Sequence, residues 1–197
     1  MDKQSVLILA SGSPRRQELI GTIGLPYRID AADVDESMPE GTAPDALVEQ
    51  LSLRKAQAVS GRVPDGEDGI VIGSDTVVVL DGRILGKPKD EQDAADMLGT
   101  IAGRTHQVYT GITCVEVRTG RVITRHEVSH VTMKPMDEER IRRYVATGEP
   151  ADKAGAYAVQ GIGALLVAKI EGDYFNVVGM SVRLLGEMLE ELGVRVL

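Results

Sequence analysis

A short apolar segment near the start of the chain is followed at once by the sequence SGSPRR, residues 11–16, and then by a helical pattern. This order predicts a strand, a tight turn and a helix, with Ser13 as the N-cap and Pro14 at the first helical position. Arg15 and Arg16 then fall in the first helical turn, where a cation opposes the helix dipole by about 0.3–1 kcal/mol. A bound anion would remove this conflict, so we expect an anion site here; the alternative is a pair of solvated arginines.

The length of 197 residues and the 43% hydrophobic content suit one compact domain or two tightly joined lobes. The sequence contains no repeat, low-complexity tract or long linker, so we predict a single domain over residues 1–197. Strand-like and helix-like segments alternate, but without the strict order of a doubly wound fold, and several hairpins are implied. We therefore predict an α/β fold with a mixed central sheet flanked by helices.

The patterns predict strands near residues 6–10, 27–30, 70–72, 77–80, 83–85, 106–118 and 121–133, and a strand-rich stretch over 156–178. They predict helices that begin at Pro14, that cover 44–60, 90–101 and 137–148, and that follow Ser181.

Charge and composition exclude several classes of function. A net charge of −8 argues against broad binding to nucleic acid or to an anionic membrane, and the chain has no Trp and one Phe for base stacking. No apolar run is long enough to span a bilayer. Residues 1–4 lead directly into a strand and no cleavage site follows, so we expect no signal peptide and a cytoplasmic protein. The single cysteine, Cys114, is expected in the core.

A carboxylate interrupts two apolar runs at Gly73-Ser74-Asp75-Thr76. Asp75 there needs a partner, because a buried charge without one is costly; it either satisfies backbone donors or does chemistry. The hairpin turn Asp81-Gly82 pairs Thr76 with Lys87 by counting back, which makes Lys87 a neighbour of Asp75 within one residue of register. An acid and a lysine beside a small-residue strand break suggest a site for a metal-bound phosphate, with Asp75 as metal ligand or as base toward water.

Other features point less clearly to a site. Residues 82–88 faintly resemble a P-loop, but the segment is one residue short and has Pro where Ser or Thr should bind Mg²⁺, so we reject a P-loop here. His126 and His130 lie four apart in a predicted strand, which separates them by about 13 Å, too far for one metal ion. Lys55, on a predicted helix, is expected on a solvated face. The glycine-rich and charged segments 148–161 and 171–179 are either ordinary turns or the wall of a pocket.

Taken together, these blocks closely resemble the Maf family of nucleoside triphosphate pyrophosphatases. The blocks are Ser11-Gly12-Ser13-Pro14-Arg15-Arg16, Gly73-Ser74-Asp75-Thr76-Val77-Val78, Leu85-Gly86-Lys87-Pro88, Gly148-Glu149-Pro150, Asp152-Lys153-Ala154-Gly155-Ala156-Tyr157, Gln160-Gly161, Glu171-Gly172-Asp173-Tyr174 and Asn176-Val177-Val178-Gly179. They occur in order from residue 6 to about residue 180, so the resemblance covers nearly the whole chain.

The resemblance implies a fold like that of the inosine triphosphate pyrophosphatases, a homodimer, and cleavage of a nucleoside triphosphate to the monophosphate and pyrophosphate with Mg²⁺ or Mn²⁺. By match to the family motifs, Asp75 would be the proton acceptor. Residues implied in substrate choice are Arg15, Thr76 and Gln160. Residues implied in phosphate contact are Ser13, Arg16, Lys55 and Lys87, and Glu36 would bind the metal together with Asp75.

The first motif together with Gln160 resembles the branch of the family that acts on dTTP and UTP. The Gln160 amide can donate to O4 of thymine or uracil and accept from the ring N3–H. Ala158-Val159 stands where the resemblance predicts Gly-Ile, which is a departure from the pattern. Two alternatives stay open: a 7-methyl-GTP pyrophosphatase, and a nucleotide-binding regulator of septum formation whose hydrolysis is incidental.

Overall fold

The structure is a computed structural model that describes residues 6–64 and 66–196. The expectation that residues 1–4 lead directly into a strand lies outside the described residues. The helices are α1 (Pro14–Gly21), α2 (Pro44–Ser60), α3 (Glu91–Ile101), α4 (Glu138–Val145), α5 (Tyr174–Val178) and α6 (Val182–Glu191), with short 3-10 helices η1 (Glu149–Asp152), η2 (Ala154–Ala156) and η3 (Gly161–Leu166). The strands are β1 (Val6–Leu9), β2 (Tyr27–Ile29), β3 (Gly69–Leu80), β4 (Arg83–Leu85), β5 (Thr105–Glu116), β6 (Val122–Met133) and β7 (Val167–Glu171).

The strands form one mixed sheet in the order β2-β1-β3-β5-β6-β7, with β4 paired to β3. β1 pairs parallel with both β2 and β3, whereas β3 with β4 and β6 with β7 are antiparallel. The predicted α/β fold with a mixed sheet is therefore confirmed.

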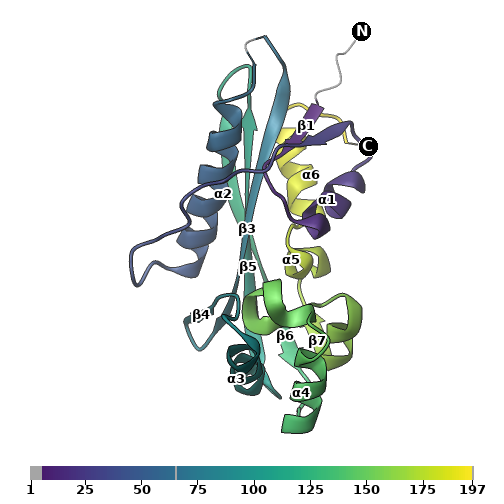
Figure 1. The fold of residues 1–197 in the computed structure, drawn as a ribbon. Coiled ribbons are helices and arrows are strands. Elements are labelled where there is room, and N and C mark those ends of the chain that lie inside the picture. Colours follow the sequence, from purple (N-terminus) through teal and green to yellow (C-terminus); the bar gives the residue numbers. More distant parts are fainter. Residues whose placement is uncertain (1–5, 65, 197) are drawn as a thin grey trace. The chain divides into compact units, whose positions relative to one another are not determined.

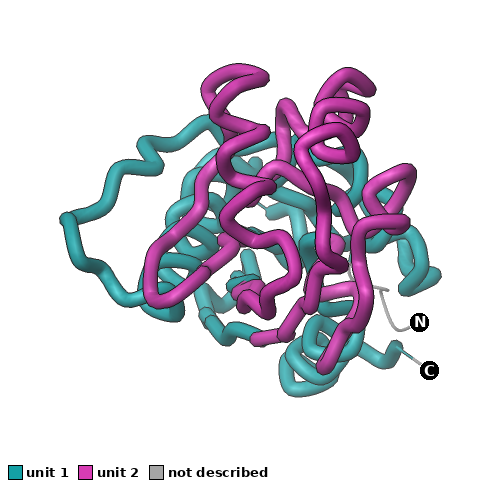
Figure 2. The backbone as a smooth tube through the Cα atoms, turned by 90° about the horizontal axis from the view of Figure 1, so that it is seen from below, with its two compact units in different colours: residues 1–75, 110–127, 179–197 teal, residues 76–109, 128–178 magenta. Residues whose placement is uncertain are grey.

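The described residues fall into two compact units, shown in separate colours in Figure 2. Unit 1 takes its residues from 1–75, 110–127 and 179–197, and unit 2 from 76–109 and 128–178. The chain passes from one unit to the other within β3, β5 and β6. The single domain predicted over residues 1–197 stays a prediction.

Unit 1 contains strands covered by helices on two faces: α2 on one, α1 and α6 on the other (Figure 1). Apolar side chains of α2 pack on β1, β3 and β5 to form a buried cluster, namely Ile8, Ala10, Ala56, Val59, Val71 and Val115. This burial of apolar area fixes α2 on the sheet.

Unit 2 has a core of its own, in which α3 and α4 pack on the unit's parts of β3, β5 and β6. Its largest members include Leu98, Ile101, Tyr144, Tyr157 and Met133. Both helices start where the sequence predicts, because an aspartate side chain caps each first turn: Asp90 accepts from the N–H of Asp93 at 2.8 Å, and Asp137 accepts from Arg140 at 2.7 Å.

Two strand predictions are wrong. β3 runs without a break from Gly69 to Leu80, through the polar residues that were expected to interrupt it. The stretch 156–178 holds one short strand, β7, and is otherwise made of η3, α5 and turns. Glycines with positive φ at Gly161 and Gly172 bend the chain there, which a strand does not allow.

Cys114 is fully buried in β5, as predicted, and burial raises the pKa of its thiol to about 12. At pH 8 only about 1 in 10,000 thiols would then be the reactive thiolate. We expect no measurable reaction of the native protein with a disulfide reagent at pH 8, and complete reaction after unfolding in guanidinium. Rapid modification of the native protein would contradict this burial.

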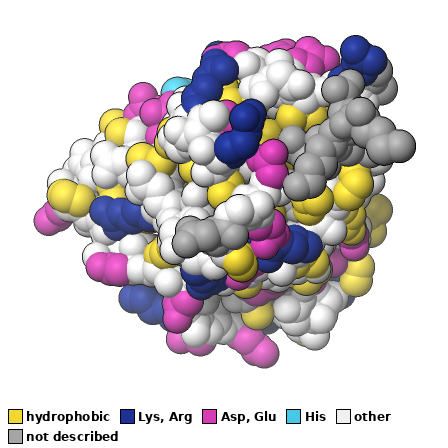
Figure 3. Space-filling model, turned by 90° about the horizontal axis from the view of Figure 1, so that it is seen from above, with side chains coloured by type: hydrophobic (Ala, Val, Ile, Leu, Met, Phe, Trp, Pro, Cys, Tyr) yellow, Lys and Arg dark blue, Asp and Glu magenta, His cyan; other side chains and the backbone are white. Residues whose placement is uncertain are grey.

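Charges of both signs are interspersed on the face shown in Figure 3. Among the residues the structure describes, no helix has both the length and the apolar character needed to cross a membrane.

Candidate active site

The turn between β1 and α1 has the predicted outline but a different hydrogen-bond pattern. Ser13 is the N-cap of α1 and Pro14 follows it, yet the Ser13 side chain makes no capping bond to the helix. Instead, the Ser13 backbone N–H donates to Ser11 Oγ at 3.2 Å. The first turn of α1 holds no acidic residue, so the charge conflict predicted from Arg15 and Arg16 is present. The anion expected there stays a prediction.

Arg16 is tied to the turn and to residues far along the chain. Its Nε donates to the Gly179 carbonyl at 2.8 Å, and its guanidinium reaches Ser11 Oγ at 3.4 Å. Burial lowers the pKa of the Arg16 guanidinium, and the nearby charge of Arg15 lowers it further. The carboxylates of Asp75 and Glu36 act in the opposite direction and raise it. Arg16 therefore belongs to the same charge cluster as Asp75 and Glu36.

The centre of this cluster is Lys55, whose ammonium lies against two carboxylates. Lys55 Nζ is 2.6 Å from Asp75 Oδ1 and 2.7 Å from Glu36 Oε1. Lys55 and Asp75 are 9% and 8% exposed, whereas the Glu36 side chain is 59% exposed. The prediction of a solvated Lys55 is therefore wrong, and Asp75 has as its partner a buried lysine on α2. Such a pair persists because each buried charge compensates the other.

Two glycines explain how a helical lysine comes to be buried. A Cβ on Gly73 would overlap the Ser52 carbonyl oxygen and lie 2.8 Å from the backbone nitrogen of Ala56. A Cβ on Gly111 would overlap the backbone of Val48. α2 thus lies with its backbone directly on β3 and β5, closer than side chains would permit. The face of α2 that includes Lys55 therefore lies close to the sheet.

Successive side chains of β3 point to opposite faces of the sheet, so its polar residues lie on two different faces. Side chains two apart share one face of a strand, so Asp75 lies on the face of Gly73, toward α2. Ser74 lies on the opposite face, where its Oγ donates to the Gly179 carbonyl at 3.1 Å. This carbonyl is the one that also accepts from Arg16. One continuous strand therefore presents an acid to α2 and a hydroxyl to the segment that precedes α6.

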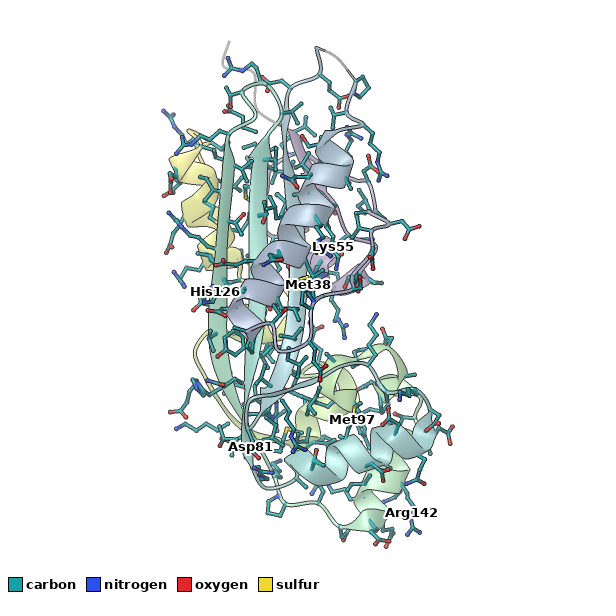
Figure 4. All side chains as sticks on the ribbon, turned by 90° about the vertical axis from the view of Figure 1, so that its left-hand side faces the viewer. Met38, Lys55, Asp81, Met97, His126 and Arg142 are labelled. Carbon is teal, nitrogen blue, oxygen red and sulfur yellow. The ribbon has the colours of Figure 1, made fainter. Side chains whose placement is uncertain are left out.

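Glu36 lies in a loop that Arg54 holds against α2. The Arg54 guanidinium donates to the carbonyl oxygens of Asp35 at 3.0 Å and Ser37 at 2.9 Å, the two neighbours of Glu36. Hydrogen bonds from the Ser37 hydroxyl and N–H lower the pKa of the Asp35 carboxyl. Figure 4 labels Lys55 on α2 and Met38, which belongs to this loop. Sequence reasoning missed the role of Arg54, because nothing in the sequence shows which loop its side chain reaches.

The oxygen atoms around Lys55 suit a divalent metal ion. Asp75 and Glu36 direct one carboxylate oxygen each at a single cation, the Lys55 ammonium. Mg²⁺ and Mn²⁺ prefer oxygen ligands, and Mg²⁺ is commonly held by one or two carboxylates together with substrate phosphates. Within residues 6–64 and 66–196 there is no group of three or more His, Cys, Asp or Glu that could hold a metal ion. The donors present fit a metal whose remaining ligands come from a substrate.

Three predicted site residues, Thr76, Lys87 and Gln160, belong to unit 2. The register predicted for the hairpin is confirmed, with Leu80 opposite Arg83 and Val78 opposite Leu85. β4 ends at Leu85, however, so the pairing does not extend to Lys87, and its contact with Asp75 stays a prediction. Gln160 is half-buried directly before η3 and makes no capping hydrogen bond to it.

His126 is not part of this cluster. It lies in β6, as predicted, and its Nδ1 is 2.7 Å from Glu49 Oε1 on α2.

Known proteins are similar to this chain over most of its length. The family described as Maf-like protein matches residues 6–192. A dTTP/UTP pyrophosphatase of Pelotomaculum thermopropionicum is 50% identical over 191 residues, which cover 97% of this chain and 98% of the relative. A dTTP/UTP pyrophosphatase of Moorella thermoacetica is 50% identical over 192 residues, which cover 98% of this chain and 97% of the relative. A solved structure, the Ham1 protein of Staphylococcus aureus, is 15% identical with a TM-score of 0.47, covering 66% of this chain and 72% of that one.

Proposed function

Since this chain belongs to the Maf family, we propose that it hydrolyses nucleoside triphosphates, dTTP and UTP before others, to the monophosphate and pyrophosphate. The observation that carries this proposal is the buried contact between Lys55 Nζ and Asp75 Oδ1 at 2.6 Å, with Glu36 on the same ammonium. Support for the substrates comes from relatives of about half identity that are named dTTP/UTP pyrophosphatases.

Asp75 is the proposed base. Lys55 holds one of its carboxylate oxygens in a fixed position, and a carboxylate held in this way can take the proton of a water molecule that attacks phosphorus. Packing of α2 on Gly73 brings Lys55 to this carboxylate.

Negative charge on the triphosphate needs compensation. Ser13, Arg16, Lys55 and Lys87 are the proposed phosphate contacts, since hydroxyl, guanidinium and ammonium groups all donate to phosphate oxygens. Asp75 and Glu36 would hold a divalent metal, which when bound acts as a Lewis acid on the phosphates.

Arg15, Thr76 and Gln160 are proposed to govern the choice of substrate. A homodimer, a cytoplasmic location and one domain over residues 1–197 belong to the same proposal.

The test is release of pyrophosphate from dTTP, UTP, CTP, GTP and 7-methyl-GTP, each with Mg²⁺ or Mn²⁺. We expect the highest kcat/KM for dTTP and UTP, with the nucleoside monophosphate as the other product and no reaction in EDTA. Preference for 7-methyl-GTP would favour the other branch of the family. Binding of dTTP without turnover would overturn the enzyme proposal and favour a nucleotide-binding regulator.

A further inference from the structure

Glu149, a residue given no role so far, and Tyr144 together bind the backbone on both sides of Gln160. Tyr144 Oη donates to Glu149 Oε1 at 2.8 Å, and the same phenol oxygen accepts from the backbone N–H of Ala158 at 3.1 Å. On the other side, the N–H of Gly163 donates to Glu149 Oε1 at 2.8 Å and that of Ile162 to Oε2 at 3.0 Å. We call Glu149 and Tyr144 the clamp.

Two glycines next to Gln160 allow the backbone to lie close to the clamp. A Cβ on Gly161, whose φ is +68°, would lie 2.5 Å from Glu149 Oε2. A Cβ on Gly163 would overlap the Ala158 carbonyl oxygen and would lie 2.6 Å from the Tyr144 hydroxyl and 2.9 Å from Glu149 Oε1. A side chain at residue 161 or 163 would press on the Glu149 carboxylate, so glycine at both positions allows the backbone to approach it closely.

The charges of the clamp match these hydrogen bonds. Burial by itself would raise the pKa of the Glu149 carboxyl, but hydrogen bonds from Tyr144, Gly163 and Ile162 hold it below its usual value. Burial raises the pKa of the Tyr144 phenol, which therefore keeps the proton that it donates. At neutral pH the Glu149 carboxylate is thus an ionised acceptor held by three neutral donors, and donors to a charged group form strong hydrogen bonds.

A second anchor holds the chain where it enters this segment. The Tyr157 hydroxyl is 2.8 Å from His106 Nε2, and the two side chains are 5% and 2% exposed. Burial lowers the pKa of His106 to about 4, so the ring is neutral at neutral pH. Gln160 thus leaves a fixed buried stretch and is followed at once by the residues that bind Glu149.

We propose that Glu149 and Tyr144 are positioning residues that fix the backbone on both sides of Gln160 and so place its amide for reading the pyrimidine base. This inference rests on the proposed function, in which Gln160 selects the base. It adds two residues that need not touch the substrate.

The test compares Glu149→Gln and Tyr144→Phe with the wild type, alone and combined with Gln160→Ala. A glutamine at 149 presents an N–H₂ where one of the donors now finds an oxygen, and phenylalanine at 144 keeps the ring but removes the hydroxyl. Because misplacing a binding group by about 1 Å can cost up to about 100-fold, we expect each single variant to raise KM for dTTP by about 10- to 100-fold. We expect kcat to stay within about twofold, because binding and not the chemical step is affected.

The double variants separate positioning from general damage. With Gln160→Ala already present, the clamp has nothing to place, so Glu149→Gln should change KM by less than about twofold. Multiplying effects in the double variant would overturn the proposal, and so would an unchanged KM in folded single variants. Tyr144→Phe decides the question if Glu149→Gln does not fold, as judged by circular dichroism.

Glu138→Gln is the matched control, since Glu138 is an exposed residue of α4 that pairs with Arg142 within its own helix. It should keep the wild-type KM and kcat. A wild-type protein that releases no pyrophosphate from any triphosphate would instead refute the proposed function, and the inference with it. That result is distinct from an active wild type whose clamp variants are unchanged.

Discussion

Asp75→Asn is expected to lower kcat for dTTP by about 1000-fold, the middle of the range that a general base contributes. Asparagine has the size of aspartate, and its Oδ1 can still accept the hydrogen bond that Lys55 donates at 2.6 Å. The neutral amide cannot take a proton from water and is a weaker ligand for a divalent metal. The loss should therefore be chemical, with α2 and β3 packed as in the wild type.

The measurement is the steady-state rate of pyrophosphate release, together with the thermal midpoint of unfolding. Asp96→Asn serves as the control, because Asp96 is an exposed residue of α3 that accepts from Gln92 at 2.9 Å. The control should keep the wild-type kcat. Activity of Asp75→Asn within about tenfold of the wild type would remove Asp75 from the role of base.

Gly73→Ala is expected to destabilise the protein by about 3 kcal/mol, at the upper end of the usual cost of overpacking. The added methyl group would overlap the Ser52 carbonyl oxygen and press on the backbone of Ala56. Neither atom can move as a side-chain tip could, so α2 has to shift from β3. Because Lys55 lies on α2 next to Ala56, such a shift would also separate its ammonium from Asp75.

Chemical denaturation measures this change in the free energy of unfolding. Gly186→Ala is the matched substitution in the same unit, since a Cβ on Gly186 in α6 meets no atom within 4 Å. Alanine is the better helix former, so this control should stabilise by about 0.5–1 kcal/mol. Equal stabilities for the two variants would contradict the close packing of α2 on β3.

Features set by neighbours in sequence could be predicted. The starts of α3, α4 and α6 follow from capping side chains, as with Ser181, whose Oγ accepts from Leu184 at 3.2 Å. The turn at Asp81 and Gly82 follows from the positive φ that both residues adopt, and it fixes the register of β3 with β4.

Features set by distant packing could not be predicted in the same way. Lys55 is buried because Gly73 and Gly111 let α2 lie on the sheet, and its own sequence neighbours give no sign of this. The polar residues that were expected to break β3 do not, because Asp75 finds Lys55 and Ser74 finds Gly179. Each partner lies at least 20 residues away in the sequence.

The proposed active-site residues became recognisable as a set only through the family resemblance. Spacing alone connected Asp75 with Lys87, whereas the structure joins Asp75 to Lys55 and Glu36. The clamp at Glu149 shows the same limit: Gly161 and Gly163 stand out in the sequence, but not the carboxylate that lies against them.

The way the units divide the chain also bears on its synthesis. Arg16 binds a carbonyl that lies 163 residues later, and this carbonyl precedes α6, which belongs to the same unit. While the ribosome is making unit 2, the turn that holds Arg16 is already outside but has no Gly179 to bind. A turn made before unit 2 is thus completed only after it, and no contiguous stretch of the chain forms either unit alone.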